Sequence, residues 1–262
     1  MNHDAMDRDT TDRAATFLLR RAFGLVLAAV LAATALPAGA GERNPVVIEL
    51  YTSQGCASCQ PASRVLGEFA REPGIIALTF PITYWDYLGW KDVYGLPAFT
   101  ARQRAYAALR GERQVFTPQA IVNGEPSMIR SDRISLERAL RRARANSATQ
   151  VSVRSWEEGD RICVDVGASA APDAQADLWL LPVMRHRRIA IGGGENKGQV
   201  VDYINVVRGM QRIGPWTGRA AHFEVPRHAA KVAEADSYVV VLQGASEGRP
   251  SRILGAAKAE GF

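Results

Sequence analysis

Cysteine is scarce in this sequence, whose 262 residues include Cys56, Cys59 and Cys163 and no others. Three cysteines are too few to hold together a small disulfide-linked scaffold, and they leave one thiol unpaired. The chain also lacks the bias of disordered or collagen-like proteins, because 47% of its residues are apolar and 23% are charged. We therefore expect one or two globular domains, each with an ordinary hydrophobic core.

Long apolar runs are also missing, apart from one stretch near the start of the chain. The run from Ala22 to Leu36 is shorter than the ~20 residues that span a bilayer. It follows Arg20-Arg21 and precedes Ala38-Gly39-Ala40, which is the order of a secretory signal peptide. We expect residues 1–40 to direct export to the periplasm or the medium; an uncleaved anchor is the alternative. The Sec route is favoured, although the arginine pair also resembles a twin-arginine signal.

An excess of charge of one sign is missing as well, because 32 Lys and Arg face 27 Asp and Glu and the net charge is +5. Many of the arginines fall between Arg130 and Arg144, in a helical pattern that indicates a solvated helix face. Nucleic acid is therefore not an expected partner, and no membrane span is expected in the mature chain.

A small, polar stretch from Ala143 to Gln150 divides the rest of the sequence. Before it, patterns of strands and helices alternate; after it, short strand patterns dominate. The expected order in the first part is a strand at 46–51, a helix from about 56 to 69, a strand at 75–80, a helix at 100–109, a hairpin around Asn123-Gly124 and a last helix to residue 144. This is the thioredoxin order. We predict a thioredoxin-like α/β domain at 45–147 and an all-β, sandwich-like domain at 150–262.

The pair Cys56 and Cys59 stands where the first strand pattern gives way to a helix. A helix N-terminus stabilises a thiolate, which is the species that attacks a disulfide. Two cysteines three residues apart lie on one helix face and can form a reversible disulfide. We expect Cys56 to be the exposed attacking thiol and Cys59 the shielded resolving thiol.

Other readings of the same pair stay open. A structural zinc half-site would need further ligands, and the candidates Cys163, His186, His222 and His228 all lie in the second half, with no ligand spacing among the histidines. A purely structural disulfide is the other alternative. No metal and no organic cofactor is therefore expected.

Two features outside the pair are compatible with redox chemistry. Glu49 is an acid within an apolar strand and could accept the proton of Cys59; its alternative is an exposed acid at a strand end. Thr117 and Pro118 open the third strand, where a cis-proline would leave the Thr117 backbone free for substrate pairing. An ordinary edge-strand proline is the alternative.

An aromatic segment follows the second predicted strand. Tyr84, Trp85, Asp86 and Trp90 belong to the crossover there, and loops at the carboxyl ends of strands in open α/β sheets line binding sites. The segment is either a substrate-binding wall beside Cys56 or a plug between domains.

Two further stretches carry weaker signals. The glycine-rich segment 192–198 lacks the lysine and the strand-to-helix context of a phosphate-binding loop, so we expect a flexible β-hairpin loop that could pack near the thiols. Cys163 alternates with apolar residues, which favours a buried structural thiol over a third redox thiol.

Together these motifs resemble the exported bacterial thioredoxin-like family known as domain of unknown function 1223. The resemblance rests on T-S-Q-G-C-A-S-C (52–59), Y-W-D-Y-L-G-W-K-D (84–92), F-T-A-R-Q-R-A-Y (99–106) and F-T-P-Q-A-I-V-N-G (116–124). It continues more weakly through G-E-N-K-G (194–198) to the C-terminus. The resemblance implies a thioredoxin-like fold with a β-rich C-terminal region and no settled activity. The chain departs from the family pattern at Ser63, where an aspartate is expected.

The strand I-E-L-Y (48–51) is similar to the strand before the active site of disulfide isomerases, which also carries a glutamate. We expect an exported thiol–disulfide oxidoreductase that acts on protein or small-molecule disulfides together with an unidentified redox partner. A Cu(I)-binding or soft-metal module at the cysteine pair and a non-catalytic binding protein with a thioredoxin fold are the alternatives.

Overall fold

Elements of the first half alternate between strand and helix, as the sequence pattern predicts. A computed structural model describes residues 44–130, 133–146, 150–171, 173–246 and 248–262. The predicted signal peptide lies outside these residues. The elements run β1 (Val46–Thr52), α2 (Cys59–Phe69), β2 (Ile75–Pro81), the short helix η2 (Asp86–Leu88), α3 (Pro97–Leu109), β3 (Gln119–Val122), β4 (Glu125–Arg130) and α4 (Arg133–Ala145).

The second half is almost entirely β-structure. Its elements are β5 (Val153–Glu158), β6 (Arg161–Val166), β7 (Ala176–Ala190), β8 (Val200–Val207), β9 (Gln211–Trp216), β10 (Ala221–Pro226), the short helix η4 (Arg227–Ala230), β11 (Ser237–Ser246) and β12 (Arg249–Lys258). The protein is therefore a mixed α/β structure with extensive sheets and few helices.

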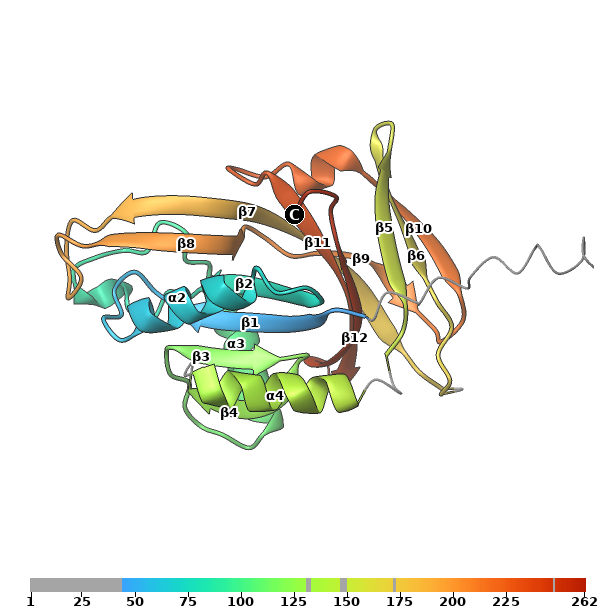
Figure 1. Ribbon diagram of the computed structural model, residues 1–262, viewed down its shortest axis with the longest axis horizontal. Helices are drawn as coiled ribbons and strands as arrows, with labels where there is room; N and C mark the ends of the chain where they lie inside the picture. Colours follow the sequence, from blue (N-terminus) through green and yellow to red (C-terminus); the bar gives the residue numbers. More distant parts are fainter. Residues whose placement is uncertain (1–43, 131–132, 147–149, 172, 247) are drawn as a thin grey trace, which may run out of the picture. The chain divides into compact units, whose positions relative to one another are not determined.

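Strands from both halves join in one nine-stranded sheet. The order is β12-β11-β7-β8-β2-β1-β3-β4, with β9 paired to β7 outside this path. β1 and β2 are parallel, whereas β3 runs antiparallel to β1. The two halves meet where β2 pairs with β8, which Figure 1 shows running beside it. We expected separate domains at 45–147 and 150–262, but the halves share this sheet and residues 44–262 form one compact unit.

The nine-stranded sheet is buried on both faces around β1. Val46, Ile48 and Leu50 pack in the same core cluster as residues of α2 and α4. Val47 and Tyr51, which point to the opposite face because side chains alternate along a strand, pack with residues of α3 and of the C-terminal strands. The seven residues of β1 are all buried, as a parallel strand in the middle of a sheet should be.

A second, three-stranded sheet has the order β10-β6-β5. Its inner side chains share a core cluster with residues of β7 and β11, so two sheets do pack face to face in this part of the chain. The expected sandwich is therefore present only in part, because one of its two sheets extends into the first half. Among the described residues, no helix is long and apolar enough to cross a membrane.

Candidate functional site

The cysteine pair forms a disulfide directly after the buried strand β1. The Cα atoms of Cys56 and Cys59 are 5.4 Å apart, and the turn between them is closed by a hydrogen bond from the Cys59 N–H to the Cys56 carbonyl. The helix begins at Cys59 rather than at Cys56, with Ser58 as its N-cap residue. Pro61 is the third helical residue, where the absence of an N–H costs no helical hydrogen bond.

Both cysteines are buried, with exposed fractions of 1% for Cys56 and 2% for Cys59. The expectation of an exposed Cys56 is therefore wrong for the disulfide form. Cys56 precedes the helix instead of starting it, so its side chain lies against the loop that leaves β1. Ala57 and Ser58, between the two cysteines, are the exposed residues, and the Ser58 hydroxyl lies 3.5 Å from the Cys56 sulfur.

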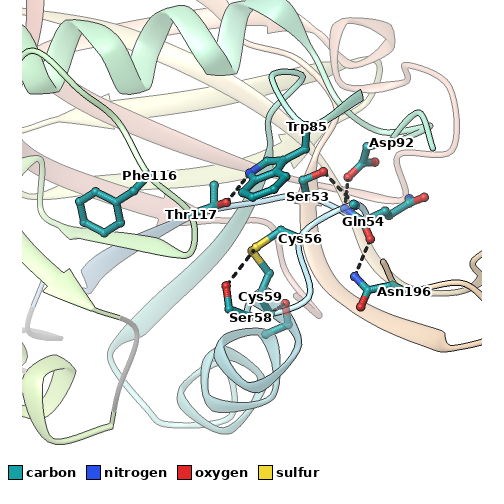
Figure 2. Close-up of a disulfide and its surroundings, with 12 residues drawn as sticks. Ser53, Gln54, Cys56, Ser58, Cys59, Trp85, Asp92, Phe116, Thr117 and Asn196 are labelled. Atoms are coloured by element: carbon teal, nitrogen blue, oxygen red, sulfur yellow. Dashed lines mark hydrogen bonds between the residues drawn. A yellow bond between two sulfur atoms is a disulfide. The ribbon is translucent and has the colours of Figure 1, made fainter. Parts of the chain in front are cut away.

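The loop before Cys56 is held through its central residue, Gln54, which is fully buried. Its backbone N–H donates to Asp92 at 2.8 Å, and its carbonyl accepts a 2.7 Å hydrogen bond from the Asn196 amide. Its side-chain oxygen accepts a 2.8 Å hydrogen bond from the Trp90 indole. Figure 2 shows Asp92 and Asn196 reaching Gln54 from different parts of the chain. Two separate segments, one with Trp90 and Asp92 and one with Asn196, therefore fix the position of the loop that carries Cys56.

Asp92 is a buried carboxylate that organises this region. Besides the Gln54 N–H, it accepts hydrogen bonds from the Tyr94 N–H at 2.9 Å and from the Tyr203 hydroxyl at 2.9 Å. Burial raises the pKa of Asp92 above its ordinary value, and these three donors oppose that rise. Asp92 thus positions the loop as a hydrogen-bond acceptor.

The glycine-rich segment 192–198 connects β7 to β8 and packs on Trp90. A Cβ atom added at Gly192 would lie 2.7 Å from the Trp90 ring, and one at Gly193 would lie 2.7 Å from the Gly89 carbonyl oxygen. The segment therefore approaches Trp90 so closely that side chains are excluded. It does lie near the thiols, as expected, and it is anchored there by Asn196.

Trp85 and Thr117 lie on the other side of the disulfide loop. The indole N–H of Trp85 donates to the Thr117 hydroxyl at 2.7 Å, and a Cβ atom at Gly55 would lie 3.4 Å from the Trp85 Cβ. The peptide bond between Thr117 and Pro118 is cis, as we expected. Figure 2 shows Trp85 and Thr117 beside Cys56, so these two residues border the disulfide.

Glu49 is a buried residue within β1. It faces the side of β1 where α3 packs, whereas the helix that carries Cys59 packs on the opposite side. Its carboxylate is buried and forms an ion pair with Arg102 at 2.6 Å, within a network that includes Tyr106 and Gln243. The carboxylate is therefore engaged in a buried ion pair, and the proton-transfer role expected for Glu49 stays a prediction.

The remaining predicted residues serve the site indirectly. Trp90 holds Gln54, and Asp86 accepts a hydrogen bond from the Asp92 N–H at 3.2 Å. Tyr84 packs against the apolar core, and burial raises its pKa to about 12. The aromatic segment thus supports the disulfide loop and anchors it to the second half.

Sequence reasoning did not single out Gln54, Asn196 or Tyr203 as parts of the site. Gln54 follows a strand and Asn196 lies in a glycine-rich loop, which are weak signals taken alone. Within the described residues, the clusters of potential metal ligands do not include Cys56 or Cys59. A metal at the pair would therefore have two thiolates and no further side-chain ligand beside it.

Solved structures of similar proteins exist. The chain resembles the crystal structure of protein AGR_C_4864 from Agrobacterium tumefaciens with a TM-score of 0.72 and 31% identity, covering 81% of this chain and 92% of that one. It also resembles HBP35 of Porphyromonas gingivalis with a TM-score of 0.55 and 11% identity, covering 82% and 74%, which is a likeness of fold alone. No curated protein matches the chain.

A family model described as "Protein of unknown function (DUF1223)" matches residues 47–243. This range contains the cysteine pair, the aromatic segment and the glycine-rich loop, on which the sequence resemblance rests. The chain therefore belongs to the DUF1223 family.

Proposed function

We propose that this protein is an exported thiol–disulfide oxidoreductase in which Cys56 and Cys59 exchange with disulfides of a protein or small-molecule substrate. The observation that carries the proposal is the Cys56–Cys59 disulfide at the junction of β1 and α2. A bond between cysteines separated by two residues closes a very short loop and adds little to stability through chain entropy. Because the bond adds little to stability, we assign it a redox role.

The surrounding structure supports a thioredoxin-like scaffold. The order β1-α2-β2-α3-β3-β4-α4, with β1 and β2 parallel and β3 antiparallel to β1, agrees with the thioredoxin order proposed from the sequence. α2 starts next to the disulfide, and its free N–H groups and dipole would stabilise a thiolate there.

The exchange proceeds in two balanced steps. In the reduced protein, the Cys56 thiolate attacks a substrate disulfide, forms a mixed disulfide and releases the first substrate sulfur as a thiolate. The Cys59 thiol then loses its proton to solvent and attacks the Cys56 sulfur. This step forms the Cys56–Cys59 bond and releases the second substrate thiolate. The substrate is reduced by two electrons, and an exported redox partner of the dithiol or disulfide class returns the protein to its starting state.

Substrate would approach between the Cys56–Ser58 turn and the Trp85–Thr117 pair. Ala57 and Ser58 are exposed there, and the Thr117 backbone next to Pro118 borders the same side. Because Cys56 is buried in the disulfide form, access to its sulfur requires Trp85 or the turn to move. No organic cofactor, metal or nucleic acid has a part in this reaction, and the disulfide suits an oxidising compartment such as the periplasm.

One observation favours a second candidate, a non-catalytic binding protein with a structural disulfide. Both cysteines of the pair are almost fully buried, and buried structural disulfides resist exchange. No observation on the described residues favours Cu(I) binding at the pair over these two functions.

The decisive experiment is an equilibration of the purified protein in glutathione and dithiothreitol buffers. An exchange catalyst should show a reversible transition between about −120 and −270 mV, whereas a structural disulfide should lie below about −300 mV. The Cys56→Ser variant should lose all insulin-reduction activity, and Cys163→Ser, which removes the thiol outside the pair, should keep it. Full activity in Cys56→Ser, or loss in both variants alike, would contradict the proposal.

A further inference from the structure

Side chains that are far apart in the sequence lie close together on the outer face of the three-stranded sheet. Cys163 lies on the central strand β6, and the register of the sheet places Glu224 of β10 opposite it. His222 of β10 lies opposite Asp165 of β6. The potential ligand atoms of Cys163, His222 and Glu224 all lie within 4.8 Å of one another. No function proposed above uses this cluster.

We propose that Cys163, His222 and Glu224 form a binding site for a divalent transition-metal ion of the zinc class. Thiolate sulfur, imidazole nitrogen and carboxylate oxygen are the three donor types that bind Zn²⁺ in proteins. Ligand atoms around a tetrahedral Zn²⁺ are about 3.5 Å apart, so small adjustments of the three side chains would close the site from the separations of up to 4.8 Å.

The orientation of His222 is an independent argument for the site. Its Nδ1 lies 2.8 Å from the Asp165 carboxylate, which can only accept a hydrogen bond when it is ionised. In the neutral imidazole, Nδ1 then carries the proton and Nε2 has a lone pair. Nε2 lies 3.5 Å from Glu224 Oε1, on the side of the cluster. A carboxylate that fixes the tautomer and direction of a ligating histidine is the usual second layer of a zinc site.

Cys163 itself is placed as a ligand would be. It is 2% exposed, but it points away from the apolar core cluster that its neighbours Ile162 and Val164 join. The Cys163 thiol donates to the Glu158 carboxylate, whose oxygen lies 3.9 Å from the sulfur. Glu158 is exposed at the end of β5 and is available as a fourth ligand; water is the alternative. Trp156 lies opposite Cys163 on β5, and its ring centre is 5.9 Å from that of His222. Trp156 therefore borders one side of the cluster.

The charges around the cluster favour a dication. Glu158, Glu224 and Asp165 bring three carboxylates to the same face. Arg161 pairs with Glu224, and Arg154 approaches Asp165 at 3.6 Å. The two arginines contact Glu224 Oε2 and Asp165 Oδ2, whereas Glu224 Oε1 faces His222 Nε2. The competing description is a cross-strand network of ion pairs without metal, and it makes opposite predictions for the experiment below.

The test uses untagged protein whose Cys56–Cys59 bond is formed, so that Cys163 is its only free thiol. Zn²⁺ binding is measured by calorimetry, and Co²⁺ is used as a spectroscopic probe. We expect one metal ion per chain and an absorption band from sulfur-to-cobalt charge transfer. Zn²⁺ should also protect Cys163 from alkylation. An ion-pair network without metal predicts neither the band nor the protection.

Variants assign the ligands. Cys163→Ser should abolish the charge-transfer band, and His222→Gln should weaken Zn²⁺ binding by at least ~100-fold. Asp165→Asn should weaken it by ~10–100-fold, as expected for a residue that orients a ligand. His186→Gln is the matched control, because His186 is also exposed and also lies near a carboxylate, that of Asp202 at 3.3 Å. Absence of the cobalt band, or equal losses in His222→Gln and His186→Gln, would overturn the proposal.

Discussion

At the scale of single residues, Glu49 and Arg102 form a buried ion pair whose contribution to stability can be measured. Glu49→Gln would leave the Arg102 guanidinium buried without its counter-ion, although Tyr106 and Gln243 would still contact it. Breaking a buried ion pair from one side typically costs about 3–5 kcal/mol. We expect a loss of about 3 kcal/mol in urea unfolding.

The matched control is Glu137→Gln, which removes the exposed carboxylate paired with Arg133. Exposed pairs on helices contribute about 0.3–0.5 kcal/mol, so this variant should be nearly as stable as the parent. Because Glu49 faces away from α2, the reduction potential of the cysteine pair should be the same in both variants. A large change in the reduction potential of the cysteine pair for Glu49→Gln alone would support the predicted proton-transfer role of Glu49.

Asp92 makes stability depend on pH. Burial raises its pKa above the ordinary value of 3.8, so the folded protein binds this proton more tightly than the unfolded chain does. Folding therefore takes up a proton in the window between 3.8 and the raised value, and the contribution of Asp92 to stability increases as the pH falls through that window. Above it, the buried charge opposes folding.

We expect the difference in unfolding free energy between the parent and Asp92→Asn to shift in favour of the parent as the pH is lowered from 7 to 4. Asparagine cannot titrate and so lacks the proton-linked contribution. Denaturant unfolding at a series of pH values measures this difference. A difference that is constant, or that shifts toward the variant at low pH, would show that the hydrogen bonds of Asp92 outweigh its burial.

At the scale of elements, the connection between β7 and β8 anchors the disulfide loop through one side chain. Asn196→Ala would leave the buried Gln54 carbonyl without its donor, which costs about 1–3 kcal/mol. Because the loop before Cys56 loses one of its three anchors, dithiothreitol should reduce the disulfide faster. Glu195→Ala, an exposed change in the same segment, should alter neither stability nor rate. Equal reduction rates in the two variants would show that Asn196 does not control access.

The elements themselves were largely predictable where a local pattern determines them. Asn123 and Gly124 have φ values of 49° and 65°, as the predicted hairpin turn requires. We predicted that the helix begins at about Cys56, but it begins at Cys59. The apolar residues of the buried helix face all lie after Cys59, so their spacing does not distinguish the two starting points. β7 is buried up to Met184 and exposed beyond it, so its burial pattern changes along the strand. The contact of Gln54 with Asn196 joins two loops far apart in the sequence, and the approach of Cys163 to His222 depends on the register of β6 and β10. No local pattern reports either.

At the scale of the whole molecule, the shared sheet makes the first half dependent on the second. The core around Val47 and Tyr51 is completed by Val183, Val207 and Val241, among others from the second half. A fragment of residues 44–146 would expose this apolar face along with the open edge of β2. We expect it to show no cooperative thermal unfolding by circular dichroism, whereas residues 44–262 should unfold cooperatively. A sharp transition in the short fragment would show that the first half folds as a domain of its own.

The contact between Arg102 and Gln243 joins residues 141 positions apart. Synthesis proceeds from the N-terminus, so Glu49 and Arg102 leave the ribosome before Gln243 and the strands β11 and β12. The ion pair of Glu49 and Arg102 therefore lacks its partner Gln243 until β11 has been made. A nascent chain that ends before β11 cannot complete this buried network.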